Sequence, residues 1–195
     1  MESPAPWQLQ PASSTTRLWL WLLAVALPLA IIGGALAFTA NDTGAKQLIG
    51  DSVWLTNALV VFGTLAITFA VHWFIARALR RHSVAVDGDG LAITTTFYTR
   101  ELGWSELQLP QARVVDLDEH TEFKPMLKTN GTSLPGFRSG WFRLRNRHKA
   151  LVAMASGPRV LHLPTTKGYD LLLQPRQPQA LLQRLQELAP ATVRR

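Results

Sequence analysis

The residues of this chain that could carry chemistry most directly are cations that follow a glycine-rich stretch. Residues 128–149 read KTNGTSLPGFRSGWFRLRNRHK, and the second half alternates aromatic and aliphatic residues with arginines. At the strand period of two, Phe142 and Leu144 share one face and Arg143 and Arg145 share the other. The basic face and the turn after it form a candidate surface for an anionic lipid headgroup or another partner, with the members Arg138, Arg143, Arg145, Arg147 and Lys149.

Two other functions are less well supported by the residues of this stretch. A phosphate-binding loop needs Gly-Lys-Ser/Thr at the start of a helix, whereas Gly140 is followed by Trp-Phe-Arg-Leu at strand period. A nucleic-acid arm would be more basic, so no nucleic-acid partner is predicted. We interpret residues 128–140 as a long connection between two halves of a β domain, in which the glycines supply turns and Trp141 begins the next strand.

An acidic run offers a possible metal site. Its members are Asp116, Asp118, Glu119, His120 and Glu122. Period two places Asp116 and Asp118 on one face, but a solvated sheet face predicts the same pattern. We favour the solvated face and predict no metal. His162 alternates within a short β pattern and is interpreted as structural, while the other histidines have no ligand spacing.

Catalytic motifs do not stand out from this background. The chain has no cysteine, which excludes a thiolate nucleophile and a cysteine metal site. It also has no HExxH, nucleophile elbow, Walker loop or dinucleotide fingerprint. The sequence therefore predicts a protein that is not an enzyme, with no cofactor and no small-molecule substrate.

Two long apolar stretches precede the candidate surface. Residues 18–38 contain no ionisable group, and residues 53–76 contain only His72. Each is long enough to cross a hydrocarbon core of about 30 Å as a helix. They predict a transmembrane hairpin over residues 18–82 after an N-terminal tail of residues 1–17, with a kink at Pro28. A cleavable signal peptide is the weaker alternative, because the first apolar run is longer than a typical signal core.

Charge around these spans predicts their orientation. Arg77, Arg80 and Arg81 follow the second span, whereas the loop between the spans has only Lys46 against two aspartates. Positive charge that flanks a span stays in the cytoplasm. We therefore expect a multi-pass protein of a bacterial inner membrane, surrounded by membrane lipids, with both chain ends in the cytoplasm.

Residues 83–190 predict a separate β domain, which leaves residues 191–195 as a C-terminal tail. Its first feature is a hairpin around Asp-Gly-Asp-Gly at residues 87–90, a turn signal rather than a calcium loop. Some seven or eight short strands are expected in the domain. An amphipathic helix then begins at Pro178 and carries one apolar stripe, composed of Leu181, Leu182, Leu185 and Leu188.

Three segments of this domain resemble the bacterial pleckstrin-homology-like (PH-like) domains that follow membrane spans. They read KTNGTSLPGFRSGWFRL, ALVAMASGPRVLHLPT and GYDLLLQPRQPQALLQRL. The resemblance covers about residues 83–190 and implies an α+β chain, in which a curled sheet or barrel is closed by the C-terminal helix. It implies a binding module and no known ligand or activity.

The combined expectation is a membrane-anchored, non-enzymatic PH-like scaffold, which acts through an unknown protein partner or as a homo-oligomer. Two alternatives remain. The net charge of +7 and the basic surface could sense anionic lipid, although the acidic turn at residues 87–90 argues against a phosphoinositide site in the first hairpin. The chain could instead be an accessory subunit of a membrane transporter or enzyme complex.

Overall fold

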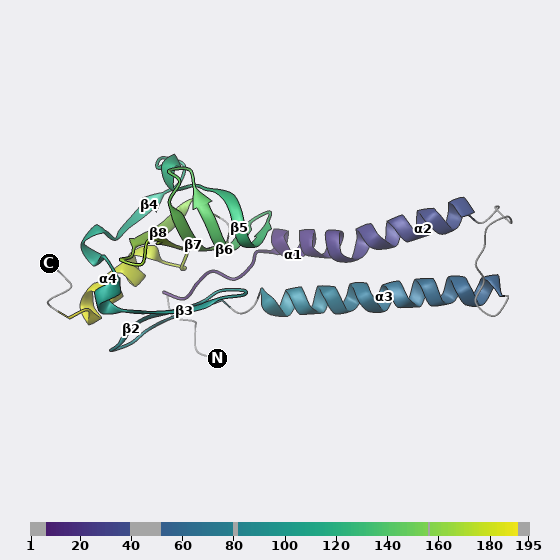
Figure 1. The fold of residues 1–195 in the computed structure, drawn as a ribbon, viewed down its shortest axis with the longest axis horizontal. Coiled ribbons are helices and arrows are strands. Elements are labelled where there is room, and N and C mark those ends of the chain that lie inside the picture. Colours follow the sequence, from purple (N-terminus) through teal and green to yellow (C-terminus); the bar gives the residue numbers. More distant parts are fainter. Residues whose placement is uncertain (1–6, 40–51, 80–81, 156, 191–195) are drawn as a thin grey trace. The chain divides into compact units, whose positions relative to one another are not determined.

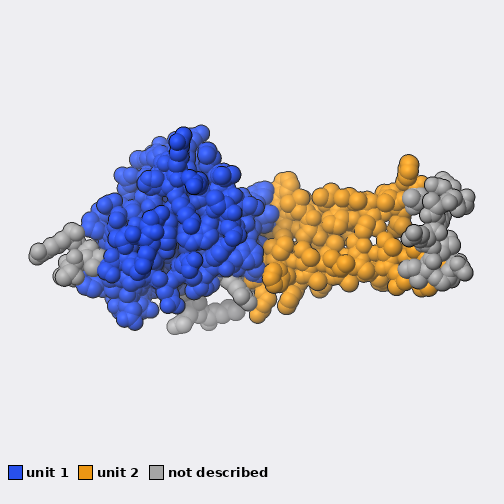
Figure 2. Space-filling view, in the orientation of Figure 1, with its two compact units in different colours: residues 1–16, 78–195 blue, residues 17–77 orange. Residues whose placement is uncertain are grey.

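A computed structural model describes residues 7–39, 52–79, 82–155 and 157–190 of the chain. The chain separates into two compact units, shown in different colours in Figure 2. The helical unit comprises Arg17–Arg77, and the β unit comprises Met1–Thr16 together with Ala78–Arg195. The helical unit is therefore inserted in the chain between two parts of one domain.

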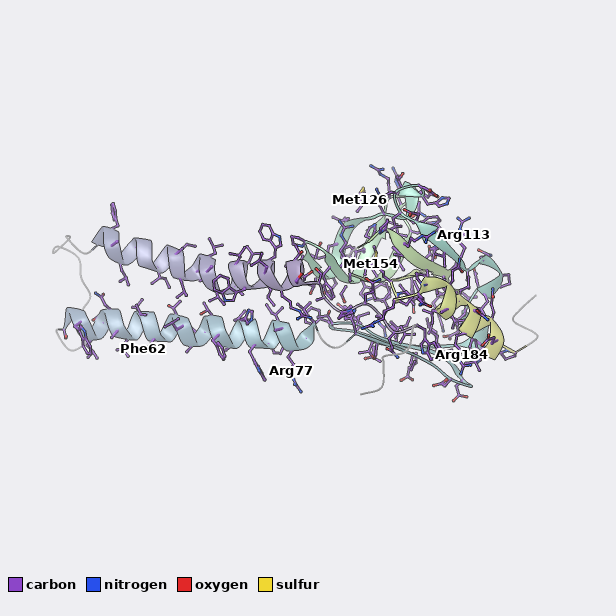
Figure 3. All side chains as sticks on the ribbon, turned by 180° about the vertical axis from the view of Figure 1, so that it is seen from behind. Phe62, Arg77, Arg113, Met126, Met154 and Arg184 are labelled. Atoms are coloured by element: carbon purple, nitrogen blue, oxygen red, sulfur yellow. The ribbon has the colours of Figure 1, made fainter. Side chains whose placement is uncertain are left out.

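Two long apolar helices form the helical unit, as the sequence predicts (Figure 1). The first contains α1 (Ser14–Trp21), a π-helical turn η1 (Leu22–Ala26) and α2 (Leu27–Thr39). The second is α3 (Val53–Ala78). By length and composition, Ser14–Phe38 and Trp54–Ala78 can each cross a membrane. Large apolar side chains cover their surfaces; Phe62, for example, is 71% exposed on α3 (Figure 3).

The first helix is irregular just before Pro28. The Leu27 N–H donates to the Leu22 carbonyl, an i to i−5 bond that closes the π-helical turn. Proline lacks an N–H and its ring crowds the preceding helical turn, so the backbone widens there instead of continuing as a regular α-helix. The sequence predicts a kink at Pro28, and the structure has a π-helical turn over the residues just before it.

A three-stranded antiparallel sheet begins the main part of the β unit. Its strands are β1 (Ser83–Val86), β2 (Gly90–Thr94) and β3 (Thr99–Gly103), in that order. The turn between β1 and β2 is closed by the Asp87 carboxylate, which accepts hydrogen bonds from the Asp89 and Gly90 N–H groups at 3.0 and 3.1 Å. This carboxylate stabilises the turn, and the predicted hairpin is confirmed.

The second sheet has six strands in the order β4-β8-β9-β7-β6-β5. All neighbours are antiparallel except β7 and β9, which run parallel. The strand bounds are β4 (Arg113–Asp116), β5 (Pro125–Leu134), β6 (Phe137–Leu144), β7 (Lys149–Met154), β8 (Arg159–Pro164) and β9 (Asp170–Leu173). Three short 3-10 turns lie in the connections, namely η3 (Trp104–Glu106), η4 (Leu109–Gln111) and η5 (Thr121–Phe123).

The glycine-rich stretch is a β-hairpin, and the prediction of a long connection over residues 128–140 was wrong. β5 and β6 pair along almost the whole stretch, and only Pro135 and Gly136 stand between the two strands. Gly131 lies opposite Gly140, where a Cβ on Gly131 would stand 2.2 Å from the Ser139 carbonyl oxygen. These two glycines therefore allow close approach of two strand backbones rather than a change of chain direction.

The C-terminal helix α4 (Pro178–Leu188) contacts β8, β4 and β1 and so reaches both sheets. Leu181 and Leu185 are fully buried in one core cluster with residues of both sheets. The predicted helix and its apolar stripe are confirmed. The predicted curled barrel takes a different form, because the described residues form two separate sheets and no closed barrel.

A second core lies on the other face of the six-stranded sheet. Along β7 and β9, alternate side chains point to opposite faces, yet both sets are buried. Phe142, Leu172 and Val152 belong to the second cluster, whereas Leu151 and Leu171 belong to the first. The central strands of this sheet are therefore buried on both faces, which agrees with their continuous apolar sequences.

The segment that precedes the first span is part of the β unit. The Gln10 N–H donates to the Gln174 carbonyl, and the Arg176 N–H donates to the Gln8 carbonyl, each at 3.0 Å. Leu9, between them, is 5% exposed within the core cluster. The sequence predicts residues 1–17 to be a tail, because a stretch this short contains no apolar period that would indicate burial.

A buried polar cluster stands where the β unit resumes after the spans. The His82 Nε2 lies 3.0 Å from both the Thr96 and the Ser139 hydroxyl oxygens, and its ring is tilted against Phe137. The Ser139 hydroxyl also accepts the Thr96 N–H. Burial disfavours the charged imidazole and lowers the pKa of His82 from 6.5 to about 4. The ring is therefore neutral at neutral pH.

Candidate functional site

An open cleft lies at one end of the six-stranded sheet, where β6 and β8 end and β7 and β9 begin. Its volume is about 670 Å³. The two connections that close this end, β6–β7 and β8–β9, both contribute to its wall. The lining side chains that matter chemically are Arg143, Arg147, Lys149, His148, His162, Tyr169 and Asp170.

The β6–β7 turn presents the cations of this cleft. The Arg147 N–H donates to the Leu144 carbonyl, the Leu144 N–H donates to the His148 carbonyl, and the Asn146 side-chain oxygen accepts the His148 N–H. This pattern places Arg147 in the left-handed conformation, with φ of 69°. Among the described residues, it is the only one other than glycine with positive φ.

Two further cations face one another across the strands. Arg143 and Lys149 are direct partners in the β6–β7 register. Among the residues that the structure describes, no carboxylate forms an ion pair with Arg143, Arg147 or Lys149. The Lys149 Nζ instead lies 4.4 Å from the ring centroid of Trp141. Within the described residues, the charges of these three side chains are thus not neutralised by an ion pair.

A carboxylate in the wall of the cleft contacts two imidazoles. The Asp170 Oδ2 lies 3.0 Å from the His162 Nε2 and 3.5 Å from the His148 Nδ1. Asp170 and His162 are 8% and 6% exposed, whereas the His148 side chain is 67% exposed. An ionised carboxylate only accepts hydrogen bonds, so the His162 ring directs its Nε2–H toward Asp170. The exposed His148 ring lies beside the same carboxylate.

One polar atom of this cluster has no partner. The His162 Nδ1 is buried without a hydrogen bond in the described residues, while its ring stacks on Phe123 at 4.3 Å between centroids. When Nε2 carries the proton, Nδ1 of a neutral ring is a bare acceptor. A buried acceptor without a donor is costly to the folded state.

The remaining ionisable groups around the cleft do not cancel its positive charge. Glu106 pairs with Lys167 at 2.6 Å, and this hydrogen bond lowers the pKa of Glu106 and raises that of Lys167. Tyr169 lines the cleft, and its pKa is raised, chiefly by burial. The phenol therefore keeps its proton at neutral pH and remains a hydrogen-bond donor.

The structure brings together three of the five predicted basic residues. Arg143, Arg147 and Lys149 line the cleft, whereas Arg145 and Arg138 do not. Arg145 is exposed in the same turn, where its N–H donates to the Lys124 carbonyl. Arg138 lies near the other end of β6, beside a separate hollow, and its guanidinium donates to the Pro125 carbonyl at 3.3 Å.

The residues expected to orient the spans are described only in part. Arg77 ends the helical unit, with its guanidinium 6.0 Å from the Trp73 ring centroid (Figure 3). Arg80 and Arg81 lie outside the described residues, as does the loop of residues 40–51 with Lys46. The orientation of the spans stays a prediction.

The acidic run has local partners. The Asp116 carboxylate accepts the Asp118 N–H, Asp118 pairs with Lys124 at 2.9 Å, and Glu122 lies 3.4 Å from His120. Strand β4 ends at Asp116, so Asp118 lies in the following turn rather than on the same sheet face. The described residues contain no group of three His, Cys, Asp or Glu side chains that could hold a metal ion.

Sequence reasoning missed the contact between His148, His162 and Asp170. His162 and Asp170 are eight positions apart and meet because β8 and β9 form an antiparallel pair in which Pro164 lies opposite Asp170. His148 joins them because β7 runs parallel to β9 and Ala150 lies opposite Asp170. The first contact could have been found from a β8–β9 hairpin register, but the second depends on a parallel pairing that local sequence does not show.

A scan against protein-family models, a search of curated proteins and a search of solved structures each find no match to this chain. The resemblance to PH-like domains therefore stays a prediction, and the geometry of the cleft carries the functional argument.

Proposed function

We propose that this chain is a membrane-anchored, non-enzymatic binding module, with a β unit that engages an anionic group through the cleft. The observation that carries the proposal is the gathering of Arg143, Arg147 and Lys149 around one cleft with no ion-pair partner in the described residues. The three cations and the Tyr169 phenol of this cleft can hold an anion through charge-assisted hydrogen bonds. The Thr165 hydroxyl is already engaged with the Tyr169 carbonyl at 2.6 Å.

The insertion of the helical unit supports the membrane anchor. Residues on both flanks of the two helices are hydrogen-bonded within one folded domain. A domain cannot be divided by a bilayer, so both flanks lie on one side of any membrane that the helices cross. Together with the arginines after the second span, this favours a cytoplasmic β unit at a bacterial inner membrane. The PH-like character of the domain is part of the same proposal.

An anionic lipid headgroup is one candidate for the anionic group that the cleft binds. The chain enters the spans directly after Thr16 and leaves them at Ala78, so the β unit is held at the membrane surface by both connections. Cations near an anionic surface contribute about 1 kcal/mol each to association. The protein partner and self-assembly expected from sequence remain predictions alongside it.

Hydrogen exchange in native membranes tests the proposal without a known ligand. The full chain is compared in membrane vesicles from its own cell and in purified zwitterionic nanodiscs. We expect slower exchange for peptides that cover residues 143–149 in the native membrane, and Arg143→Glu should remove the difference. Peptides from β2 and β3 serve as the internal control. Equal exchange in the two settings at residues 143–149 would reject a cleft occupied in the cell.

A further inference from the structure

We infer that the cleft binds a phosphate monoester. This inference rests on the proposed binding function and specifies the chemistry of the ligand. Three observations carry it: the cross-strand cation pair, the left-handed arginine, and the net positive charge of the cleft.

The cross-strand pair costs stability when the cleft is empty. Like charges that stand directly opposite on neighbouring strands repel one another. Arg143 and Lys149 stand in this arrangement, with no carboxylate paired to either in the described residues. An anion bound between them converts the repulsion into two favourable charge-assisted hydrogen bonds.

Arg147 adds a second cost to the same hairpin. A left-handed residue after a tight turn is ordinarily glycine or asparagine, because a larger side chain crowds its own backbone there. This turn instead has an arginine at φ of 69°, and the arginine lines the cleft. Strain of this kind persists at ligand-binding sites, where the side chain is needed and the fold supports it. The fold therefore keeps an arginine side chain at this position despite the backbone strain.

The net charge of the cleft matches a monoester. The three cations Arg143, Arg147 and Lys149 and the carboxylate of Asp170 sum to about +2. A phosphate monoester carries about −1.5 to −2 at pH 7, whereas a diester carries only one negative charge. Its three terminal oxygens can also accept from the arginines, the lysine and the Tyr169 phenol.

Calorimetry on the full chain in phosphatidylcholine nanodiscs tests the inference. The soluble probes are glycerol 3-phosphate and inorganic phosphate, with succinate as a dianion without phosphorus. The lipid probes are nanodiscs that contain phosphatidic acid, a monoester, or phosphatidylglycerol, a diester, compared by their protection of residues 143–149 from hydrogen exchange. A soluble or a lipid monoester that binds in preference to its control supports the inference, and the two sets of probes distinguish the source.

Matched variants locate the binding. Arg147→Asn removes a cleft cation at a left-handed position that asparagine tolerates, so the melting temperature should not fall. We expect this variant to weaken monoester binding by about tenfold, the loss of one charge-assisted hydrogen bond. Arg145→Asn makes the same change in the same turn outside the cleft and should alter affinity by about twofold or less.

Three results would overturn the inference. They are an absence of monoester binding, equal binding of the monoester and its control, and equal weakening by Arg147→Asn and Arg145→Asn. In each case the proposed binding function survives if the native-membrane protection of residues 143–149 still depends on Arg143. If that protection is also absent, both ideas fail.

Discussion

The two units of this protein use the same apolar residue types in opposite ways. In the β unit, Leu151, Leu172 and Leu185 are fully buried among other side chains. In the helical unit, Phe38 is 89% exposed and Trp54 is 79% exposed. A surface this apolar is unfavourable in water, whereas hydrocarbon solvates it without cost. The β unit therefore supplies its own apolar environment, whereas the helical unit exposes its apolar side chains, as a membrane-spanning segment would.

The largest expected effect comes from comparing one leucine substitution in each unit. Leu185→Ala should lower the unfolding free energy of the β unit by about 2–5 kcal/mol, because a fully buried side chain leaves a cavity. Leu59→Ala, at a position 49% exposed on α3, should leave the β unit unchanged. Hydrogen exchange of β7 in the detergent-solubilised full chain measures both. Equal protection in the two variants would mean that α4 is not docked on the sheets.

The second prediction concerns His82, the titratable group of the β unit whose pKa burial lowers most plainly. Its pKa is about 4 when folded and 6.5 when exposed, so the unfolded chain binds more protons between these values. Above pH 6.5, His82 should not reduce the unfolding free energy of the β unit. As the pH drops toward 4, His82 should lower this free energy by about 3 kcal/mol. Melting temperatures of the β unit across this range test the slope.

His82→Gln is the control for that slope. Glutamine keeps a hydrogen-bonding group near the Thr96 and Ser139 hydroxyls but does not titrate. The variant should therefore lose part of the pH dependence between 6.5 and 4. A wild-type slope in the variant would assign the acid sensitivity to other groups.

The smallest expected effect tests which unit contains the N-terminal segment. Gly136 has φ of +73°, and a Cβ there would lie 3.2 Å from the Ser13 and Thr16 hydroxyl oxygens. Gly168 has φ of +77° and nothing within 4 Å of such an atom. Both changes to alanine should cost about 1 kcal/mol for the backbone, and Gly136→Ala should cost more because it also displaces the segment.

Melting of the two alanine variants separates these contributions. The Thr16 hydroxyl donates to the Pro135 carbonyl at 3.0 Å, so displacement of the hairpin should also release protection at residues 8–16. Gly168→Ala should leave that protection intact. If both variants melt together with residues 8–16 unchanged, the segment contributes little to the β unit.

Local sequence patterns were sufficient to predict several elements. The two apolar helices, the Asp-Gly turn and the helix that begins at Pro178 are each specified by residues close in sequence. The strand alternation that buries Phe142 and exposes Arg143 is equally local. The glycine-rich stretch shows the limit, because glycine marks both a turn and a close strand pair, and only the register of β5 and β6 separates these roles.

The sequence by itself determined where the apolar helices lie and that the cations after Trp141 alternate with buried residues, because both follow from periods of a few residues. The tertiary structure alone decided that Arg143, Arg147 and Lys149 share a cleft with His148, His162 and Asp170. It also decided that residues 8–16 belong to the β unit. The physical reason is that strand order, a parallel β7–β9 pair and a docked segment depend on contacts between residues far apart in the chain, which no local period encodes.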